Sequence, residues 1–530
     1  RDSGKSLQDS SGMTTDANPK ILTAGKDTVI LFHPRTYPGP IISAVPYEFL
    51  NLGRMLNGKL RLVLIDEQLE PDYLPQIRLN AERLLLAGVS TMTGYQLYGA
   101  REFSKAVKQY TEAPVVWGSW HPSLLTEEVL RENFVDFTVS GQGEPAFERL
   151  ADALFTGSAF SDIPNLGYKN GGNIMVNPRG KIRNPNDFPP IDFSLIDVAR
   201  YNTKKRFSEK TMWYFASFGC PNACGFCSMA NVFGRGWWHR PVGEVITHLK
   251  YLKEKSGMGA VRFEDPTFFV KRDFTLELCR RMIEENLDIL WHANASASRF
   301  LKLFSVEDVK LMYRAGLRQV FIGAESGDEE VLEKINKEST VKDNLDIVSL
   351  LKRGGVKPNY AIMVCFPWNP EKDFRNTMKM VMKAKLIDRS LDVSLNFFKP
   401  VPGTPLYDTC IRYGFKPPTD IDGWIRYMMV RFKAPWYEGD FLVKMRIMKR
   451  IYFPLMTPGL FRKVQGWKKI VFLLLVIWMR PMVYLRFLSG NMSFPWDGYI
   501  LYYSIRWFNR LTGLNWGMGK SGKEYKHKDL

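Results

Sequence analysis

Three cysteines in the middle of the chain constrain its fold and chemistry more than any other feature. Cys220, Cys224 and Cys227 have the spacing C-x3-C-x2-C, and the other three cysteines are scattered along the chain. Soft thiolates this close together bind an iron–sulfur cluster or zinc. A structural zinc site would need a fourth Cys or His at ligand spacing, for which His239 is the nearest candidate. The spacing is not that of a zinc finger, so it favours a four-iron cluster with three protein ligands and one iron open to a small molecule.

The composition limits the partners of the protein. The chain has 530 residues, enough for two to four domains, and a net charge of +18. Such an excess favours anionic partners, such as a phosphate-bearing cofactor, an acidic substrate or an anionic membrane surface, and the alternative is a solvated lysine-rich surface. Six cysteines with a cluster motif predict a reducing, cytoplasmic location. Residues 1–25 are expected to be a disordered tail without a signal peptide, in which Arg1–Gly12 is left from expression and Met13 is the natural start.

Residues 26–160 alternate between apolar runs and helical patterns. This alternation predicts a doubly wound, Rossmann-like α/β domain with a parallel sheet. Ligands of such sheets bind beyond the carboxyl ends of the strands, where the loops of this chain are rich in Gly, Pro, Ser and Thr. No G-x-G-x-x-G follows the first strand, so a nicotinamide cofactor is not expected. The expected strands are Thr28–Phe32, Leu60–Ile65, Leu85–Ser90, Pro114–Trp117 and Asp136–Val139.

Residues 161–210 are expected to be a linker, and residues 211–410 a second α/β domain. The turn signal Asn170–Asn173 predicts a hairpin within the linker. In the second domain, six strand–helix units predict a partial (β/α)6 barrel, in which reactive groups gather at the carboxyl ends of the strands. Chemically suggestive residues follow all six expected strands. They are the three cysteines, then Glu264 and Asp265, Asn294 and Ser296, Glu325, Cys365, and Lys399.

Residues 411–530 predict a helical domain with interleaved aromatic and basic residues. This segment holds seven of the 14 tryptophans, and its one long apolar run, Ile470–Trp478, is too short to span a bilayer. A basic, apolar helical surface can lie on a membrane. The alternative is a helical cap that buries its apolar face over the mouth of the barrel. The two interpretations are compatible if the substrate is a lipid.

The cysteine motif resembles that of the radical S-adenosylmethionine (SAM) superfamily. In that family the open iron holds SAM, and reductive cleavage gives methionine and a 5′-deoxyadenosyl radical, which implies an external one-electron reductant such as ferredoxin or flavodoxin. The resemblance also implies SAM contacts for Phe226, Asp265, Ser296 and Glu325. From the residues alone, Phe226 could be part of the core, Glu325 could pair with Arg318, and Asp265 could cap the next helix.

The loops of the first domain resemble those of the cobalamin-binding domain in front of many radical SAM enzymes. The matching stretches are Gly88–Gln96, Val116–Pro122 and Asp136–Glu144, in which Ser119 and Gln142 depart from the family pattern. The D-x-H-x-x-G signature of a histidine ligand to cobalt is absent, so His121 is expected to shape a loop or contact the cofactor tail. A ligand-free sheet kept for assembly is the alternative. The resemblance implies cobalamin contacts from Ser90, Thr91, Met92, Thr93, Gly94, Tyr95, Gly118, His121, Pro122, Gly141, Gly143 and Glu144.

Together these resemblances cover residues 26–408 and imply a cobalamin-dependent radical SAM enzyme. The commonest chemistry of that family is transfer of a SAM-derived methyl group, through methylcobalamin, to an unactivated carbon after hydrogen abstraction by the 5′-deoxyadenosyl radical. The alternative is an oxidative or ring-forming enzyme without net methylation, like the anaerobic cyclase of chlorophyll synthesis. A cofactor-binding regulator without catalysis is a third hypothesis, against which the intact cysteine motif argues. The substrate is expected to be apolar (a lipid, terpenoid or tetrapyrrole), with peripheral membrane contact as an option and no nucleic-acid partner.

Overall fold

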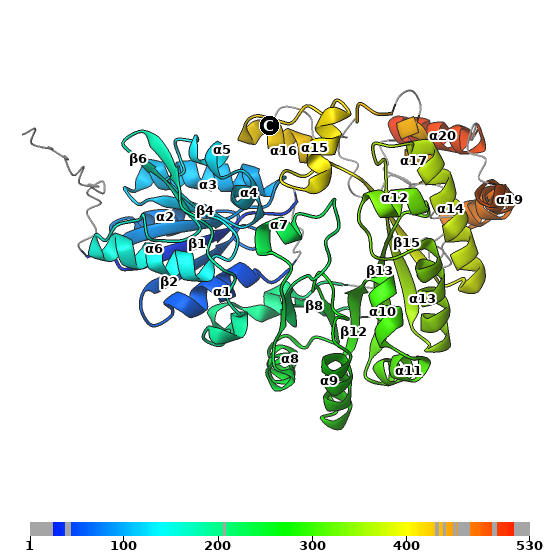
Figure 1. Cartoon of the computed structure of the whole chain (residues 1–530), viewed down its shortest axis with the longest axis horizontal. Helices are drawn as coiled ribbons and strands as arrows, with labels where there is room; N and C mark the ends of the chain where they lie inside the picture. The colour runs from blue at the N-terminus through cyan, green and yellow to red at the C-terminus, as the bar shows by residue number, and fades with distance from the viewer. Residues whose placement is uncertain are drawn as a thin grey trace, which may run out of the picture.

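The computed structural model contains two mainly parallel sheets flanked by helices, followed by a helical C-terminal part (Figure 1). It describes residues 25–37, 44–204, 208–429, 434–437, 441–448, 452, 467–489 and 496–512. The tail expected over residues 1–25 therefore lies outside the described residues except for Gly25.

The first sheet confirms the prediction of a doubly wound α/β fold. Within the described residues its strand order is β2-β1-β3-β4-β5-β6-β7, and β1 to β5 are parallel. The chain winds outward in opposite directions from β1 and β3, so the switch point at which such sheets bind ligands lies between these two strands. The strands are β1 (Thr28–His33), β2 (Arg61–Asp66), β3 (Leu84–Ser90), β4 (Val115–Gly118), β5 (Phe137–Val139), β6 (Leu166–Asn170) and β7 (Asn173–Val176).

Helices cover both faces of the first sheet. Phe49 of α1 and Phe147 of α6 pack on one face, and Phe103 of α3 and Val129 of α5 pack on the other. Because both faces are covered, the parallel strands are near-continuous apolar runs, and Leu84–Ala87 is fully buried. The helices are α1 (Tyr47–Leu56), α2 (Leu74–Asn80), α3 (Gln96–Tyr110), α4 (Trp120–Leu124), α5 (Thr126–Leu130) and α6 (Glu144–Thr156).

The linker differs from the prediction at its beginning. The predicted hairpin forms, but β6 pairs antiparallel with β5, so the hairpin extends the first sheet. The remainder contacts both domains. Arg54 of α1 donates to the carbonyl oxygens of Pro185 and Pro189, at 3.2 and 3.3 Å, and Asn202 donates to that of Ser256 at 2.8 Å.

The second sheet is an open, parallel half-barrel, as the sequence predicts. Its strand order is β15-β14-β13-β12-β11-β8. Apolar side chains on one face of every strand pack against the surrounding helices, which makes the largest core of the protein. The strands are β8 (Thr211–Tyr214), β11 (Ala260–Phe263), β12 (Leu290–Ala295), β13 (Leu317–Glu325), β14 (Lys357–Val364) and β15 (Asp392–Phe397). The helices are α8 (Val242–Ser256), α9 (Arg272–Glu284), α10 (Ala297–Leu303), α11 (Val306–Arg314), α12 (Glu329–Lys334), α13 (Val341–Arg353), α14 (Pro370–Ile387) and α15 (Pro405–Arg412).

A small ribbon and a short helix between the sheets were not predicted. β9 (Ser217–Gly219) pairs antiparallel with β10 (Trp237–His239), and α7 (Met229–Phe233) lies between them in the chain. Figure 1 shows α7 between the first sheet and the half-barrel. The cysteine motif therefore lies at the junction of the two domains, between β9 and α7.

The C-terminal part is helical, as expected, but its helices lie on different surfaces. Trp424 of α16 (Ile421–Met429) joins the core of the first domain beside α3, while α19 (Trp467–Ser489) packs against α14 on the outside of the half-barrel. Two further helices are α17 (Phe441–Ile447) and α20 (Trp496–Thr512). None of the helices in the described ranges is both long and apolar enough to cross a membrane. Trp516 and the residues after Thr512 lie outside the described residues.

Candidate active site between the two sheets

The three motif cysteines lie together on one loop and are each partly exposed. Burial raises the pKa of Cys224 to about 11 and also raises the pKa of Cys220 and of Cys227. The thiols are therefore protonated near neutral pH when no metal is bound. Binding of an iron–sulfur cluster must release these protons, because the thiolate is the ligand.

A neighbouring loop holds the backbone of the cysteine motif in place. The amide of Gly225 donates to the carbonyl oxygen of Ile335 at 2.7 Å, and the side-chain amide of Asn336 donates to that of Ala223 at 2.8 Å. From the other side, the Arg299 guanidinium donates to Asn222 Oδ1 at 3.1 Å. The three cysteines and the hydrogen bonds that hold their loop fit a cluster with three cysteine ligands.

Glu325 forms a buried ion pair with a residue that the sequence did not single out. It ends β13 beside a register shift and has a φ of 56°, which is rare for a residue with a side chain. Its Oε1 lies 3.1 Å from Nζ of Lys337, and both side chains are almost fully buried. The alternative pairing with Arg318 is wrong, because Arg318 donates to the carbonyl oxygens of Tyr313 and Leu317.

Lys337 places a positive charge beside the cysteines. Burial lowers the pKa of Lys337, but the negative charge of the Glu325 carboxylate, joined by those of Cys224 and Cys220 once their thiols ionise, raises it by more, so the net shift is upward. A Cβ added to Gly323 would come within 2.9 Å of Nζ, so the ammonium lies against the end of β13. Lys337 follows α12 in a polar loop, and nothing in its sequence context distinguishes it from the many exposed lysines of the chain.

Asp265 is directed at the backbone that leads into the cysteine loop. Its carboxylate accepts hydrogen bonds from the amide of Ala216 at 3.3 Å and from the amide and hydroxyl of Ser217. Burial raises the pKa of Asp265 to about 6, against the effect of these hydrogen bonds. The alternative role as a helix cap is wrong, since the next helix, α9, begins beyond Lys271.

The other predicted SAM contacts are close to the same edge of the sheet. Phe226 is half-buried, with its ring centre 6.5 Å from that of Phe366, in an apolar cluster under α15. Ser296 is buried with its hydroxyl 3.3 Å from that of Ser339. Lys399, which follows β15, instead donates to the carbonyl oxygens of Tyr427 and Met428 and so fastens α16.

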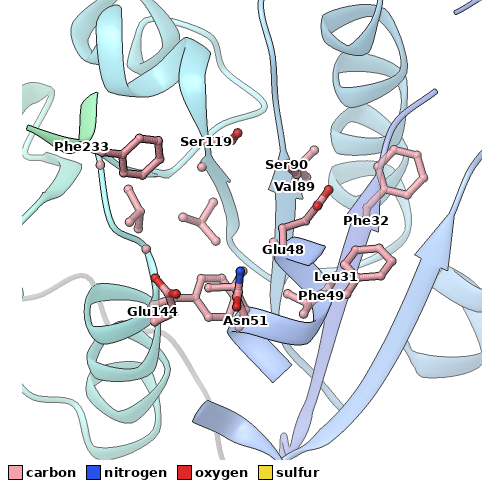
Figure 2. A pocket seen from close by; sticks show the side chains of 18 of the residues that line it. Leu31, Phe32, Glu48, Phe49, Asn51, Val89, Ser90, Ser119, Glu144 and Phe233 are labelled. Carbon is pink, nitrogen blue, oxygen red and sulfur yellow. The ribbon is translucent and has the colours of Figure 1, made fainter. Parts of the chain in front are cut away.

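A cavity of about 160 Å³ opens at the carboxyl ends of β1, β3 and β4 in the first sheet (Figure 2). For comparison, an engineered cavity of about 150 Å³ holds a benzene molecule. Figure 2 shows Glu48 and Phe49 of α1 on one side of the cavity and Phe233 of α7 on the other. Phe218, two residues before the first motif cysteine, also lines it. The cavity therefore belongs to both the first domain and the cysteine loop.

Some of the residues expected to contact cobalamin line this cavity, and others do not. A Cβ on Gly118 would meet only the carbonyl oxygen of Val139, at 3.9 Å, so glycine leaves room there. The residues that line it are Ser90, Gly118, Gly141, Gly143 and Glu144. Those that do not are Thr91, Met92, Thr93, Gly94, Tyr95, His121 and Pro122. A planar aromatic group of a cofactor tail fits this cavity, and the second set lies on the loops beside it.

His121 is fully buried beneath α16. Its Nδ1 is 3.0 Å from the Thr93 hydroxyl, and its ring lies edge-on to Trp424 at 6.1 Å. Burial lowers the pKa of His121 to about 3. This placement supports a loop-shaping role, because His121 contacts the hydroxyl of Thr93 on one loop and the ring of Trp424 on α16.

The two departures from the cobalamin-loop pattern have different consequences. Ser119 has φ 81° and ψ −153°, a conformation that is essentially restricted to glycine. Gln142 is buried, donates to the carbonyl oxygen of Arg183 at 3.0 Å and accepts from its amide at 2.8 Å. An ionised glutamate could not make both bonds, so this glutamine attaches the linker to the first domain.

Several residues of the cavity were missed from the sequence. Glu48 lies at the edge of the cavity and pairs with His33. Burial lowers the pKa of His33, but the Glu48 carboxylate raises it by more, so the pKa is raised to about 9. Arg54 of α1 pairs with Glu144 at 3.3 Å, and both are buried. These pairs join segments that are far apart in the chain, and no local pattern marks them.

Comparison with known proteins agrees with this architecture. The family model of the radical SAM superfamily matches residues 214–381, which include all three motif cysteines and Glu325. These residues form a radical SAM domain. It is 29% identical over 324 residues to an uncharacterized methyltransferase of Pyrococcus horikoshii, an alignment that covers 61% of this chain and 68% of that protein. It is 24% identical to the anaerobic magnesium-protoporphyrin IX monomethyl ester cyclase of Rubrivivax gelatinosus, over 56% of this chain and 53% of the cyclase.

The arrangement of the domains is also found in a solved radical SAM structure. The cobalamin-dependent SAM radical enzyme OxsB, with aqua-cobalamin and SAM bound, superposes with a TM-score of 0.66 at 14% identity, over 92% of this chain and 76% of OxsB. At this identity the likeness concerns the fold. The chain thus shares with OxsB a fold in which a Rossmann-like domain precedes the half-barrel.

Proposed function

We propose that this chain is a cobalamin-dependent radical SAM methyltransferase that places a SAM-derived methyl group on an unactivated carbon. One observation carries the proposal: Phe218 and Phe233, on either side of the cysteine motif, line the cavity at the switch point of the first sheet. A cofactor bound in the first domain therefore reaches the site at which the cysteines would hold a cluster and SAM. Two groups that must react with each other would be neighbours without a domain movement.

Different residues of the site bind the cluster, SAM and cobalamin. Cys220, Cys224 and Cys227 hold the [4Fe-4S] cluster, and Glu325 accepts hydrogen bonds from SAM. Phe226 and Ser296 contact SAM from the loops around them, and Asp265 positions the cysteine loop. The loops after β3, β4 and β5 bind cobalamin through backbone and small side chains, among them Gly118, Gly141 and Gly143. When bound, the cluster and SAM supply the radical, and cobalamin supplies the methyl group.

A second function is supported by a specific relative, the magnesium-protoporphyrin ester cyclase. In that case the same radical would start an oxidative ring closure without methyl transfer. The two functions differ in whether a methyl group from SAM enters the product.

The experiment uses reconstituted protein with SAM that carries a deuterated methyl group, a low-potential reductant such as reduced flavodoxin, and cell extract as the source of substrate. Methyl transfer predicts a product heavier by the labelled methyl group, together with 5′-deoxyadenosine. The variant with all three motif cysteines changed to alanine should lose iron and produce neither. A new product without the label would favour the cyclase, and full iron retention in the triple variant would contradict the cluster assignment.

We also propose that the substrate is mainly apolar and enters from an anionic membrane. The protein would be cytoplasmic and would bind the surface of that membrane peripherally. Exposed apolar side chains form a stripe on each of the two outer helices. The residues are Leu474, Ile477 and Leu485 on α19, and Trp496, Ile500, Tyr503 and Trp507 on α20. Beside α19, the exposed Arg375, Lys379 and Lys383 follow one face of α14 without an ion pair among the described residues. Apolar stripes next to unpaired cations favour an anionic bilayer surface.

Sedimentation with vesicles tests this contact. The protein should pellet with phosphatidylglycerol-containing vesicles at low salt, and release at high salt or with phosphatidylcholine alone. Ile500→Asp should weaken the contact, whereas Leu79→Asp, at a more exposed position on α2 of the first domain, should not. A protein that ignores anionic vesicles at low salt would end the membrane part of the proposal.

A further inference from the structure

The inner face of the half-barrel is polar, and this property was not visible in the sequence. Along each strand, one set of side chains packs into the helical core, while the alternate set is mostly half-buried or exposed on the opposite face. Strand register brings the second set together. Its polar and aromatic members are Trp213, Arg262, Glu264, His292, Asn294, Gln319, Phe321, Lys357, Asn359, Asp392, Ser394 and Asn396, and its small or apolar members are Gly323, Ala361 and Met363.

The charges on this face are paired with one another. The Arg262 guanidinium pairs with Glu264 and lies between the rings of Trp213 and Phe321, at 5.1 and 5.0 Å from their centres. Lys357 pairs with Asp392 at 2.5 Å, and Gln319 donates to the same carboxylate at 3.2 Å. Both positive charges, those of Arg262 and Lys357, are therefore matched by a nearby carboxylate.

Gln319 and Asn294 are hydrogen-bonded within the protein, and the other uncharged polar groups of this face remain for a ligand. Asn359 lies beside Asp392 in register, and its Oδ1 accepts a long, 3.5 Å hydrogen bond from the Ser394 hydroxyl. Ser394 and Asn396 are exposed on the edge strand β15. The indole N–H of Trp213 is buried and has no acceptor among the described residues. A hydrocarbon placed on this face would strip water from amides and hydroxyls without replacing their hydrogen bonds, which opposes binding.

We infer that the part of the substrate that enters the half-barrel carries several hydroxyl or amide groups and no net charge. The substrate is then an amphiphile, with an uncharged polar end on the inner face of the sheet and an apolar body outside it. Aromatic faces next to amide and hydroxyl groups suit such an end, because Trp213 and Phe321 present flat apolar surfaces while the amides supply directional bonds. This inference rests on the proposed function, since it takes the half-barrel to be the place where the substrate reacts.

The test separates the substrate class from the reaction itself. Holoenzyme is incubated with S-[methyl-14C]adenosylmethionine, reductant and one of two fractions of a small-molecule extract from the cells that encode the chain. One fraction is soluble in hexane and the other in aqueous methanol. The inference expects the label to enter a compound in the aqueous methanol fraction. Label only in hexane-soluble compounds, or in neither fraction while 5′-deoxyadenosine forms, overturns it. If no 5′-deoxyadenosine forms, the proposed function fails and the inference fails with it.

A variant on the inner face provides the second measurement. Asn359→Leu keeps the size of the side chain and removes its hydrogen-bonding groups, so the KM for the labelled acceptor should rise at least tenfold. Cofactor absorbance and melting temperature should stay as in the parent protein, which shows that the fold is intact. Asn173→Leu, on the exposed β7 of the hairpin, is the control and should leave the KM unchanged. An Asn359→Leu variant with the KM of the parent overturns the assignment of this face to the substrate.

Discussion

Replacing Lys337 by methionine should destabilise the half-barrel far more than the loss of one hydrogen bond. The Lys337 and Glu325 side chains are 8% and 11% exposed, so the change leaves the Glu325 carboxylate buried without its partner. Breaking a buried ion pair in this way costs about 3–5 kcal/mol. For a domain of this size, 1 kcal/mol corresponds to about 2–4 °C in melting temperature. The transition of the half-barrel should therefore fall by roughly 6–20 °C.

A double variant and a control identify the cause. Lys337→Met combined with Glu325→Gln removes both charges, so it should recover most of the loss, because an uncharged buried pair carries a much smaller penalty. Lys334→Met breaks an exposed pair with Glu330 and should change stability by less than about 1 kcal/mol. Differential scanning calorimetry of the metal-free proteins, under one buffer and scan rate, measures these shifts. A single variant that melts with the parent, or a double variant that melts as low as the single one, would refute the reasoning.

Four further predictions concern individual residues. Electron paramagnetic resonance of the cob(II)alamin form should show no nitrogen splitting from His121; a splitting lost in His121→Ala would contradict its loop-shaping role. Glu325→Ala should weaken SAM binding by roughly tenfold or more with unchanged iron content, since a charged hydrogen bond contributes about 1.5–3 kcal/mol; unchanged affinity by calorimetry would assign Glu325 a structural role only. Ser119→Gly should raise stability by about 1 kcal/mol, because relief of about 1–3 kcal/mol of backbone strain exceeds the entropic cost of glycine, and a lower melting temperature would count against it. The pKa of Asp265 is raised to about 6, so its contribution to the free energy of unfolding is greatest at low pH and is lost as the pH rises through that value. Between pH 5 and pH 7 the free energy of unfolding of the parent should fall by about 1 kcal/mol relative to that of Asp265→Asn. A difference between the two proteins that does not change with pH in denaturant titrations would contradict this.

Local patterns predicted the strands well. The third strand of the first domain was expected at Leu85–Ser90 and is found as Leu84–Ser90, because a short apolar run between two helical patterns is typical of a buried strand. The cysteine loop was likewise predictable, since its three ligands lie within eight residues and their spacing is a local property. The ribbon of β9 and β10 was missed, because its two strands are three residues long and are joined through the cysteine loop.

Side-chain roles were predicted less well than positions. The SAM contact expected of Asp265 stays a prediction, and the hydrogen bonds that its carboxylate accepts from the amides of Ala216 and Ser217 were not expected. The helix α16 was assigned to a separate domain, yet Trp424 is buried in the core of the first domain. Both outcomes depend on which segments meet in space, and residues that meet are separated here by tens to hundreds of positions in the chain.

The cysteine motif and the order of the two α/β domains could both be predicted from local sequence patterns. A metal-binding motif, an apolar run and a glycine-rich loop each depend on a few consecutive residues, so they can be predicted before the fold is known. Three features became visible only in the folded structure. Lys337 lies beside the cysteines, Phe218 and Phe233 line the cavity of the first domain, and polar side chains gather on the inner face of the half-barrel. The physical reason is that strand register and domain docking create these sites from side chains whose neighbours in the chain point elsewhere.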